Sequence, residues 1–358
     1  MSGERPSLEW RTGWPVLADA AWWDGWEAAR ARAPRSHVFH RADVLRAWYD
    51  TVARTQQHEP VMIRYTAPAG ARVYLAATVV PYQGRWAGRR VLEPAGQDLF
   101  GAHDPLVDGD ADAVDWDAFW DAVRDAAVGV DQALFRFVPP SMSGRVRAEP
   151  AGDECPVLSL EGVPSLDAML ARCSANHRGD VRRRIRRAQE QGAVALQVFD
   201  PSTATQAMAE FDGAFWPVWS AASAEHGWGL HTRPGLAAFC QRVVREGVAG
   251  GWAHFAVLRV GDAPVAWHLG LADAGRVYWW LPVHDPAHDA LAPGKLLLAL
   301  LVARLIDDGW RELHFQTGAQ AYKQAWQPAW PPLMAVRWHA PSARGRVLAL
   351  HDRLGRHA

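Results

Sequence analysis

Residues 278–326 decide the fold, and they read YWWLPVHDPAHDALAPGKLLLALLVARLIDDGWRELHFQTGAQAYKQAW. The stretch predicts a strand up to Leu281, a loop that ends in Ala292-Pro293-Gly294-Lys295, and then a long apolar helix. Proline and glycine directly ahead of a helical run mark the residue where such a helix begins. A second strand at Leu313–Phe315 and a helix around Tyr322 follow. This order of strand, helix, strand and helix predicts a mixed α/β fold.

The start of the apolar helix is a candidate anion site. Backbone N–H groups without partners at a helix N-terminus bind phosphate well, especially where a small residue lets the ligand approach. Gly294 would provide the close approach, and Lys295 would add a mobile positive charge. The alternative is a plain helix start with a solvated lysine, because Pro-Gly starts are common without a ligand.

Length and composition predict a globular protein with more than one domain. The 358 residues exceed what one hydrophobic core usually fills. Hydrophobic residues at 49% and charged residues at 22% are ordinary values for a globular chain. With 38 basic and 39 acidic residues, the chain has no overall attraction to DNA or to an anionic membrane surface.

Nothing in the chain predicts export, a membrane span or a metal centre, so we expect a cytoplasmic protein without a metal ion. The N-terminus lacks an apolar signal core, and the apolar run 296–306 contains Arg304 and is too short to cross a bilayer. The run His284–Asp289 matches no zinc signature. Three widely spaced cysteines fit neither a disulfide framework nor a metal site. They are Cys155, Cys173 and Cys240.

The predicted elements fall into two halves with a similar order. Residues 1–160 read as two helices (Ala20–Arg32 and Arg41–Arg54), a strand pair, a helix and two strands. Residues 161–358 read as a basic helix at about Leu166–Gln191 and a strand, two helices, three antiparallel strands joined by tight turns, of which the first is Ala253–Val260, and then helix, strand, helix and strand. We therefore expect two domains, 1–160 and 161–358, with a duplicated layout but no visible sequence repeat.

Short motifs in the second half resemble one known family. The segment 292–296 (APGKL), Gly309, and Gly318 followed by Tyr322-Lys323 and Trp326 look like the CelD-like branch of the GNAT acyltransferase superfamily. The run 174–178 (SANHR) ahead of an arginine-rich helix, and Trp219 before a glycine-containing loop, also fit this branch. Its members are bacterial acyltransferases that are often linked to polysaccharide biosynthesis. The resemblance covers roughly residues 165–340.

The resemblance implies tandem GNAT-like domains, each a mixed, mostly antiparallel sheet flanked by helices. The N-terminal domain would be degenerate, and the C-terminal domain would bind acetyl-coenzyme A or another acyl-coenzyme A. The same architecture is similar to that of the Fem-type aminoacyl transferases, which use aminoacyl-tRNA as the donor. One motif departs from the family pattern. The usual pyrophosphate loop is richer in glycine, whereas residues 291–296 contain one glycine and a proline, which has no N–H.

Three residues are candidates for catalysis. Tyr322 lies where the resemblance places the tyrosine that protonates the departing thiolate, and a phenol can do this while uncharged at neutral pH. A packing tyrosine is the alternative. His268 is the lead for the general base because imidazole titrates near neutral pH, although a buried histidine with satisfied hydrogen bonds would look the same in the sequence. Asp285 is the third candidate, and His284 is a further rival for the base.

Two more sets of residues are predicted to bind ligands. Backbone amides of the strand would polarise the thioester carbonyl, the helix start would hold the pyrophosphate, and Lys323 would pair with a phosphate or a carboxylate. This donor set is Leu281, Val283, Ala292, Pro293, Gly294, Lys295 and Lys323. Aromatic rings beside polar groups suit a sugar ring, although core packing explains tryptophans equally well. The acceptor set is Trp219, Trp228 and Arg178.

A basic helix adds a second possible anion site. Between Arg172 and Gln191 there are seven arginines against two carboxylates. A solvated helix face with ion pairs explains this charge. The alternative is an anionic partner, namely coenzyme phosphates, a nucleotide-linked sugar or tRNA.

These observations predict a GNAT-type acyltransferase. It would move an acyl group from coenzyme A to a hydroxyl or amine of a sugar-containing or other small acceptor by direct attack. Two other functions stay open from the sequence, an aminoacyl-tRNA-dependent transferase and a non-catalytic binding module. No Ser-His-Asp or Cys-His arrangement is evident that would indicate a covalent enzyme intermediate.

Overall fold

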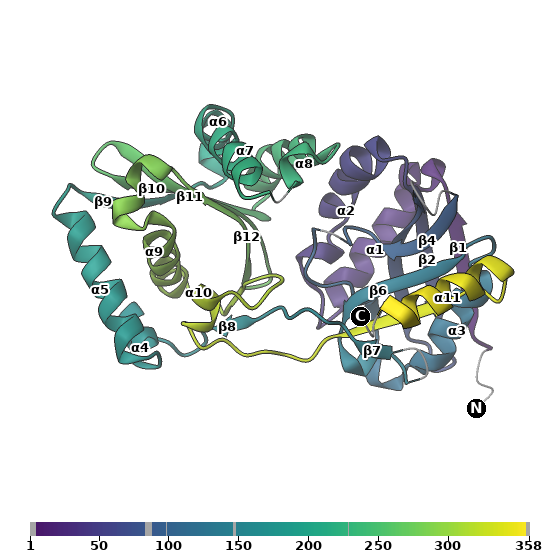
Figure 1. Ribbon diagram of the computed structural model, residues 1–358. Coiled ribbons are helices and arrows are strands. Elements are labelled where there is room, and N and C mark those ends of the chain that lie inside the picture. The colour runs from purple at the N-terminus through teal and green to yellow at the C-terminus, as the bar shows by residue number, and fades with distance from the viewer. Residues whose placement is uncertain (1–4, 83–87, 98, 146–147, 228, 356–358) are drawn as a thin grey trace. The chain divides into compact units, whose positions relative to one another are not determined.

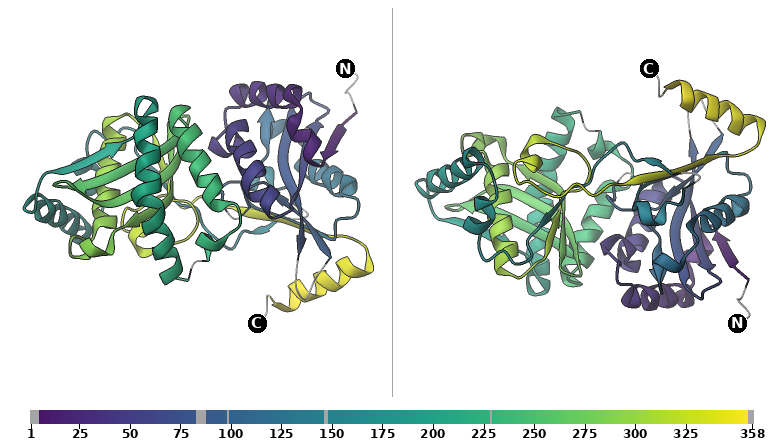
Figure 2. Two further views of the ribbon diagram at one scale, coloured as in Figure 1. Left: turned by 90° about the horizontal axis from the view of Figure 1, so that it is seen from above. Right: turned by 90° about the horizontal axis from the view of Figure 1, so that it is seen from below.

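A computed structural model describes residues 5–82, 88–97, 99–145, 148–227 and 229–355. The chain divides into two compact units, which are called here the first unit (residues 1–153 and 332–358) and the second unit (residues 154–331). Each unit contains one mixed sheet with helices on both faces (Figures 1 and 2). The predicted mixed α/β class is therefore confirmed.

In the first unit the sheet has the strand order β1-β2-β3-β4-β6-β14-β7, and β5 pairs with β3. Neighbouring strands are antiparallel except β4 and β6, which are parallel. The strands are β1 (Ser7–Thr12), β2 (Glu59–Thr66), β3 (Arg72–Tyr82), β4 (Arg89–Pro94), β5 (Leu106–Asp108), β6 (Gln132–Val138), β7 (Ala148–Pro150) and β14 (Met334–His339). The helices are α1 (Ala20–Arg32), α2 (Ala42–Trp48), α3 (Trp116–Ala126) and α11 (Ala343–Gly355).

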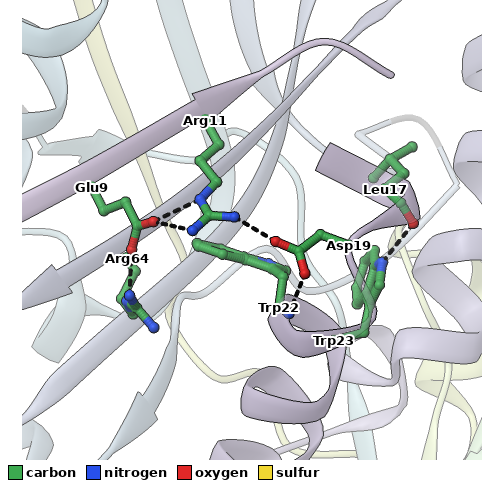
Figure 3. A network of polar contacts seen from close by, with 7 residues as sticks. All are labelled: Glu9, Arg11, Leu17, Asp19, Trp22, Trp23 and Arg64. Carbon is green, nitrogen blue, oxygen red and sulfur yellow. Dashed lines mark hydrogen bonds and ion pairs between the residues drawn. The ribbon is translucent and has the colours of Figure 1, made fainter. Parts of the chain in front are cut away.

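A polar network around Asp19 fixes the start of α1 beside β1 (Figure 3). The Asp19 carboxylate caps α1 by accepting from the Trp22 amide at 3.2 Å, and it accepts from the Arg11 guanidinium at 2.6 Å. Arg11 also donates to Glu9, which forms an ion pair with Arg64 of β2. A helix cap of this kind contributes about 1 kcal/mol, whereas the partly exposed ion pairs contribute less.

In the second unit the strand order is β8-β13-β12-β11-β10-β9, and β12 and β13 are the parallel pair. The strands are β8 (Val157–Ser159), β9 (Val194–Val198), β10 (Ala253–Val260), β11 (Ala263–Asp273), β12 (Arg276–His284) and β13 (Glu312–His314). The helices are α4 (Leu166–Ala171), α5 (Ala175–Gln189), α6 (Ala204–Glu210), α7 (Trp216–Glu225), α8 (Leu236–Arg242), α9 (Pro293–Asp307) and α10 (Ala321–Gln324).

The apolar helix α9 lies on one face of the second sheet, and α4 and α5 pack against it (Figure 1). Helices α6, α7 and α8 cover the other face. Leu297, Leu301 and Leu305 of α9 are fully buried, at spacings that place them on one side of a helix. Burial of this stripe fixes where α9 lies, and so it also fixes where the start of α9 meets β12.

Most predicted elements occur at the expected residues, with two informative differences. The predicted helix Leu166–Gln191 is two helices, α4 and α5. The second begins at Ser174, whose hydroxyl accepts from the His177 amide at 3.2 Å. Strands β1 and β4 were not predicted, because both are short and neither has a long apolar run. Across the described ranges, every helix is too short or too polar to cross a membrane.

The division into units differs from the predicted boundary at residue 160. The units change at residues 153–154 and again at 331–332. Strand β14, expected in the second domain, pairs with β6 and β7 and so belongs to the first sheet. Strand β8, expected in the first domain, pairs with β13 of the second sheet. The pattern of a strand indicates which residues are buried, but it does not indicate which strand is its partner.

Candidate functional site

The second sheet opens between β12 and β13. Their parallel pairing covers only residues 276–278 of β12 and 312–314 of β13, although β12 continues to His284. On that side, the rest of β12 has no strand neighbour within the described part of the chain, while it stays paired with β11 on the other side. A strand that loses its neighbour exposes backbone N–H and C=O groups with which a ligand can pair.

The direction of the β12 amides follows from one hydrogen bond. The Asp285 amide donates to the Val265 carbonyl of β11 at 3.0 Å. Backbone groups alternate direction along a strand, so the amides of Val283 and Leu281 also point towards β11. This orientation does not favour the predicted contact of these two amides with a thioester.

The carbonyls of Trp280 and Pro282 and the amide of His284 therefore point towards the open side of β12. Proline has no N–H, so the His284 amide is the donor that this alternation places on the open side. No local sequence pattern indicates this amide. Only the register of the finished sheet shows which alternate amides face outwards.

Helix α9 begins with an unusual backbone. Ala292 precedes the helix with φ 48° and ψ 60°, a left-handed conformation that is unfavourable for alanine and further restricted before proline. Its methyl group has no oxygen that could cap the first amides. A Cβ at Gly294 would meet only His284 Nδ1, at 3.7 Å. Local strain of this kind accumulates at ligand sites, and here it accompanies a helix start that no side chain caps.

Two charged groups flank this helix start. The Lys295 side chain is 57% exposed, and its Nζ lies 3.9 Å from Asp180 Oδ2 of α5. The pKa of Asp180 is lowered, chiefly because Arg184 donates to the carboxylate. Asp180 therefore has a closer cationic partner than Lys295. The Lys295 ammonium can turn towards an anion at the helix start without leaving a buried charge unpaired.

His284, at the end of β12, lies beside the start of α9. His284 Nε2 lies 2.8 Å from Asp289 Oδ1, and its other ring nitrogen faces Gly294. Asp285 has a different task, because its carboxylate caps the short 3-10 helix 286–291 by accepting from the Ala287 amide at 2.9 Å. This contact does not favour the base role predicted for Asp285.

Tyr322 is tied to β12 by a tryptophan. The Trp279 indole N–H donates to the Tyr322 hydroxyl at 3.2 Å. Burial raises the pKa of Tyr322, and the hydrogen bond from Trp279 opposes that rise. The phenol thus stays protonated at neutral pH, which agrees with a role as a proton donor. Trp279 was not predicted as a site residue, since no local pattern connects a strand residue with a helix more than forty positions later.

The structure buries the predicted base His268 completely, at 0% exposure. Burial lowers its pKa well below the ordinary value, and the neighbouring His254 lowers it further. Its ring stacks on Trp279 with centroids 4.5 Å apart and planes 12° apart. A neutral ring without solvent access is a poor proton acceptor for an incoming substrate, so this burial does not favour the predicted role.

Lys323 holds a loop together. Its Nζ donates to the carbonyls of Thr317 (2.6 Å) and Gly318 (3.2 Å), and the residue is 3% exposed. Burial lowers its pKa to about 8. The ammonium is therefore occupied by the segment that leads into α10, and this arrangement does not favour the predicted phosphate contact.

The two described acceptor candidates lie on different helices, Trp219 on α7 and Arg178 on α5. Trp219 is 1% exposed and stacks on Trp216 with centroids 5.3 Å apart, so it offers no ring face to a sugar. Trp228 lies outside the described residues. Arg178 is half-buried near the start of α5.

One group of metal-type ligands occurs among the described residues, in the first unit: His37, His40 and Asp104. His37 Nε2 lies 2.9 Å from Asp104 Oδ1, and His40 Nε2 lies 2.8 Å from the Asp104 carbonyl. The two rings are stacked with centroids 3.7 Å apart and planes 23° apart. Hydrogen bonds to Asp104 thus hold the two imidazoles together in the first unit.

Comparison with known families identifies one segment. Residues 175–324 match the family model described as an acetyltransferase (GNAT) domain. The match begins in α5 and ends in α10, so it contains the open side of β12, the start of α9 and Tyr322. No curated protein sequence matches the chain.

Several solved structures share the fold at low sequence identity. FemX has a TM-score of 0.57 and 7% identity, over 87% of this chain and 95% of that one. The C-terminal domain of a protein named as a lysylphosphatidylglycerol synthetase from Agrobacterium fabrum has a TM-score of 0.54 and 16% identity, over 92% and 96%. A conserved protein of unknown function from Bacteroides thetaiotaomicron has a TM-score of 0.53 and 12% identity, over 88% and 96%. These likenesses span both units and concern the fold alone.

Proposed function

From the premise that residues 175–324 form a GNAT domain, we propose that the chain is an acyltransferase that uses an acyl-coenzyme A. The acyl group would pass to a hydroxyl or amine of a small acceptor, and a sugar-containing acceptor remains the prediction from the sequence resemblance. We also keep the predicted cytoplasmic location as part of this proposal.

One observation carries the proposal: the uncapped start of α9 adjoins the end of β12, the strand whose other side is open. Phosphate groups suit the helix start, because no side chain caps it, the Gly294 amide has no partner among the described residues, and Gly294 leaves space beside that amide. An extended chain suits the open side of β12, where the His284 amide and the Trp280 carbonyl face outwards. An acyl-coenzyme A has both parts, a pyrophosphate and an extended arm that ends in a thioester.

The residues of the chain would divide the chemistry between them. The Lys295 ammonium and the Gly294 amide would hold the pyrophosphate. A backbone amide on the open side of β12 would polarise the carbonyl under attack. Tyr322 would give its proton to the departing sulfur. The bound coenzyme supplies an activated acyl group, and the fold supplies position, so no covalent bond to the enzyme is needed.

Calorimetric titration of the full chain with acetyl-, butyryl- and longer acyl-coenzymes tests this function. We expect saturable binding at one site per chain. Thiol release should then require an added amine or hydroxyl acceptor, and a thiol reagent can follow it. Absence of binding for every chain length would remove the proposal. Binding without thiol release over a broad acceptor panel would favour the third possibility, a binding module without catalysis.

A second candidate donor is aminoacyl-tRNA, and the surface of α5 is the observation that favours it. Arg186 and Arg187 are exposed and form no ion pair with any described residue, whereas Arg182 pairs with Asp167 at 2.7 Å. Exposed arginines without partners attract nucleic-acid phosphates. Steep salt dependence of tRNA binding, lost in Arg186→Ala/Arg187→Ala, would support this donor. Binding that is weak and equal in both proteins would dismiss it.

A further inference from the structure

The strand that lines the proposed donor site contains an irregularity. In the pairing of β11 with β12, Leu269 faces Leu281 but Leu271 faces Tyr278. Trp279 and Trp280 therefore both lie opposite the single residue Gly270. A bulge of this kind redirects the side chains of the strand that carries the extra residue. Trp279 is turned into the core on the α9 side, where it is 4% exposed.

Gly270 is needed for this arrangement. A Cβ at this position would lie 2.3 Å from the Tyr278 carbonyl oxygen and 2.5 Å from His268 Cε1. Both distances are far shorter than any real Cβ contact, so only glycine lets the bulged strand and the His268 ring approach so closely. The stacking of His268 on Trp279 depends on that approach.

The stacked pair fixes the direction of the indole N–H. His268 is fully buried, and its pKa is far below the ordinary value because of that burial, so the imidazole is a neutral, flat surface under the indole. With its plane set by this surface, the Trp279 indole directs its N–H to the Tyr322 hydroxyl. The orientation of Tyr322 is thus determined by a residue of the strand that lines the site.

The polarity of this hydrogen bond has a chemical consequence. An indole nitrogen can only donate, so the Tyr322 oxygen must be the acceptor. The hydroxyl proton is then not used in the bond to Trp279, and no other described residue accepts it. A phenol held in this way presents its proton to a group outside the protein. The phenolate that is left after proton loss would be stabilised by the indole N–H.

We propose that Trp279 is a positioning residue for acyl transfer, and that His268 supports it as a platform and not as a base. This inference rests on the proposed function. As the acceptor nitrogen or oxygen bonds to the acyl carbon, the carbon–sulfur bond breaks and Tyr322 transfers its proton to the sulfur. The acceptor releases its own proton to water, and water returns a proton to the Tyr322 phenolate. Protons and electrons balance without an oxidant or a metal ion.

Trp279→Phe tests the inference, because it keeps a flat ring on His268 but removes the N–H. We expect kcat to fall about tenfold, the worth of one hydrogen bond, with an unchanged KM for the acyl-coenzyme. The alkaline limb of the kcat profile should move to higher pH. Its position reflects loss of the Tyr322 proton, and removal of the indole donor raises the pKa of that phenol.

A matched control separates positioning from stability. Trp267 lies on β11, is 2% exposed, and its indole N–H donates to Glu210 at 2.6 Å on the opposite face of the sheet. Trp267→Phe removes an equivalent buried bond away from the site. We expect it to destabilise the protein at least as much as Trp279→Phe but to leave the alkaline limb in place. Equal effects of both variants on the pH profile would overturn the inference.

A double-mutant cycle with Tyr322→Phe gives the second measurement. If Trp279 acts through Tyr322, then Trp279→Phe lowers kcat in the wild type but adds nothing in the Tyr322→Phe background. A full tenfold loss in both backgrounds would show that Trp279 acts independently and would refute the proposal. Failure of the proposed function would look different, because the wild type itself would then neither bind an acyl-coenzyme nor release thiol.

Discussion

The two sheets share an order of six strands, which β5 and β7 extend in the first unit, but the sheets differ where the fourth strand leads to the next helix. In each sheet, four antiparallel strands are followed by a parallel neighbour and then by an antiparallel strand. In the first unit, β4 ends at Pro94, just after its pairing with β6 at Leu92. In the second unit, β12 continues to His284, well beyond its last pair with β13. Within the described residues, a long open strand side at this place therefore occurs in the second unit and not in the first.

The two units also differ at the N-termini of the helices α3 and α9. Asp115 caps α3 in the first unit by accepting from the Ala118 amide at 3.0 Å, and Asp117 adds a further carboxylate in the first turn. Helix α9 in the second unit begins with Ala292 and has no side-chain cap. In the first unit, a protein carboxylate thus occupies the anion position at the helix start. In the second unit, this position is available to a ligand. This difference supports the donor site proposed for the second unit.

Gly294→Glu should have the largest effect on acyl-coenzyme binding at the start of α9. It places a carboxylate where the phosphates would dock, and like charges in contact cost several kcal/mol, so acyl-coenzyme affinity should fall at least about 100-fold. A glutamate in the first turn favours the helix, so the fold should persist. Gly294→Ala is the matched control, since a Cβ there meets only an ordinary contact. Wild-type binding heat from Gly294→Glu would place the phosphate site elsewhere.

Ala292→Asp transfers the arrangement of the first unit to the second. Aspartate tolerates the left-handed backbone at this position better than alanine, so the variant should fold at least as well as the wild type. Its carboxylate would compete with the ligand for the first amides, and we expect affinity to fall roughly tenfold. Ala292→Asn has the same shape without the charge and should bind almost normally. An equal loss of acyl-coenzyme affinity in Ala292→Asp and Ala292→Asn would indicate a steric cause. It would contradict the electrostatic explanation for the difference between the two units.

Lys323→Met probes the segment that carries Tyr322. The pKa of Lys323 is lowered to about 8 from 10.5, so between these values the unfolded chain binds more protons than the folded one. Unfolding free energy of the wild type should therefore rise with pH from about 8 to 10.5, relative to the variant. Urea titrations of both proteins at pH 7, 8.5 and 10 measure this difference. If the unfolding free energies of the two proteins changed equally with pH, the Lys323 ammonium would not be desolvated in the folded protein.

Asp115→Ala should have the smallest effect. Loss of the α3 cap is expected to cost about 1 kcal/mol of unfolding free energy. Acyl-coenzyme binding should not change, and the uncapped α3 should not gain a binding site, because Asp117 keeps the first turn negative. Chemical unfolding and calorimetry measure the two quantities. A second binding event in Asp115→Ala would show that the first unit keeps a latent donor site.

The sequence predicted the features that depend on local patterns. The limits of α1 and β10 agree with the predicted residues, because apolar spacing and capping residues are local signals. The start of α9 was predicted from a Pro-Gly pair. The GNAT resemblance, based on a few short motifs between Ser174 and Trp326, is confirmed by the family match over residues 175–324.

The features that depend on register or on distant contacts were not predictable. Because side chains alternate along a strand, either Trp267 or His268 was expected to face a cleft, but alternation alone does not show which face a helix will cover. The bulge at Trp279 and Trp280 shifts the alternation of side chains within β12, and its one sign in the sequence is Gly270 inside the neighbouring strand. The contact between Trp279 and Tyr322 joins two elements whose proximity arises only after α9 has packed on the sheet.

The position of β14 has a consequence for biosynthesis. Its partners β6 and β7 are translated long before it, and the whole second unit, residues 154–331, is made in between. At ordinary elongation rates of about 5–20 residues per second, the edge of β6 waits roughly 10–40 s on the ribosome before its permanent neighbour emerges. The unit that is synthesised first is thus completed last. We expect this unpaired edge of β6 to be the main target for chaperones during synthesis.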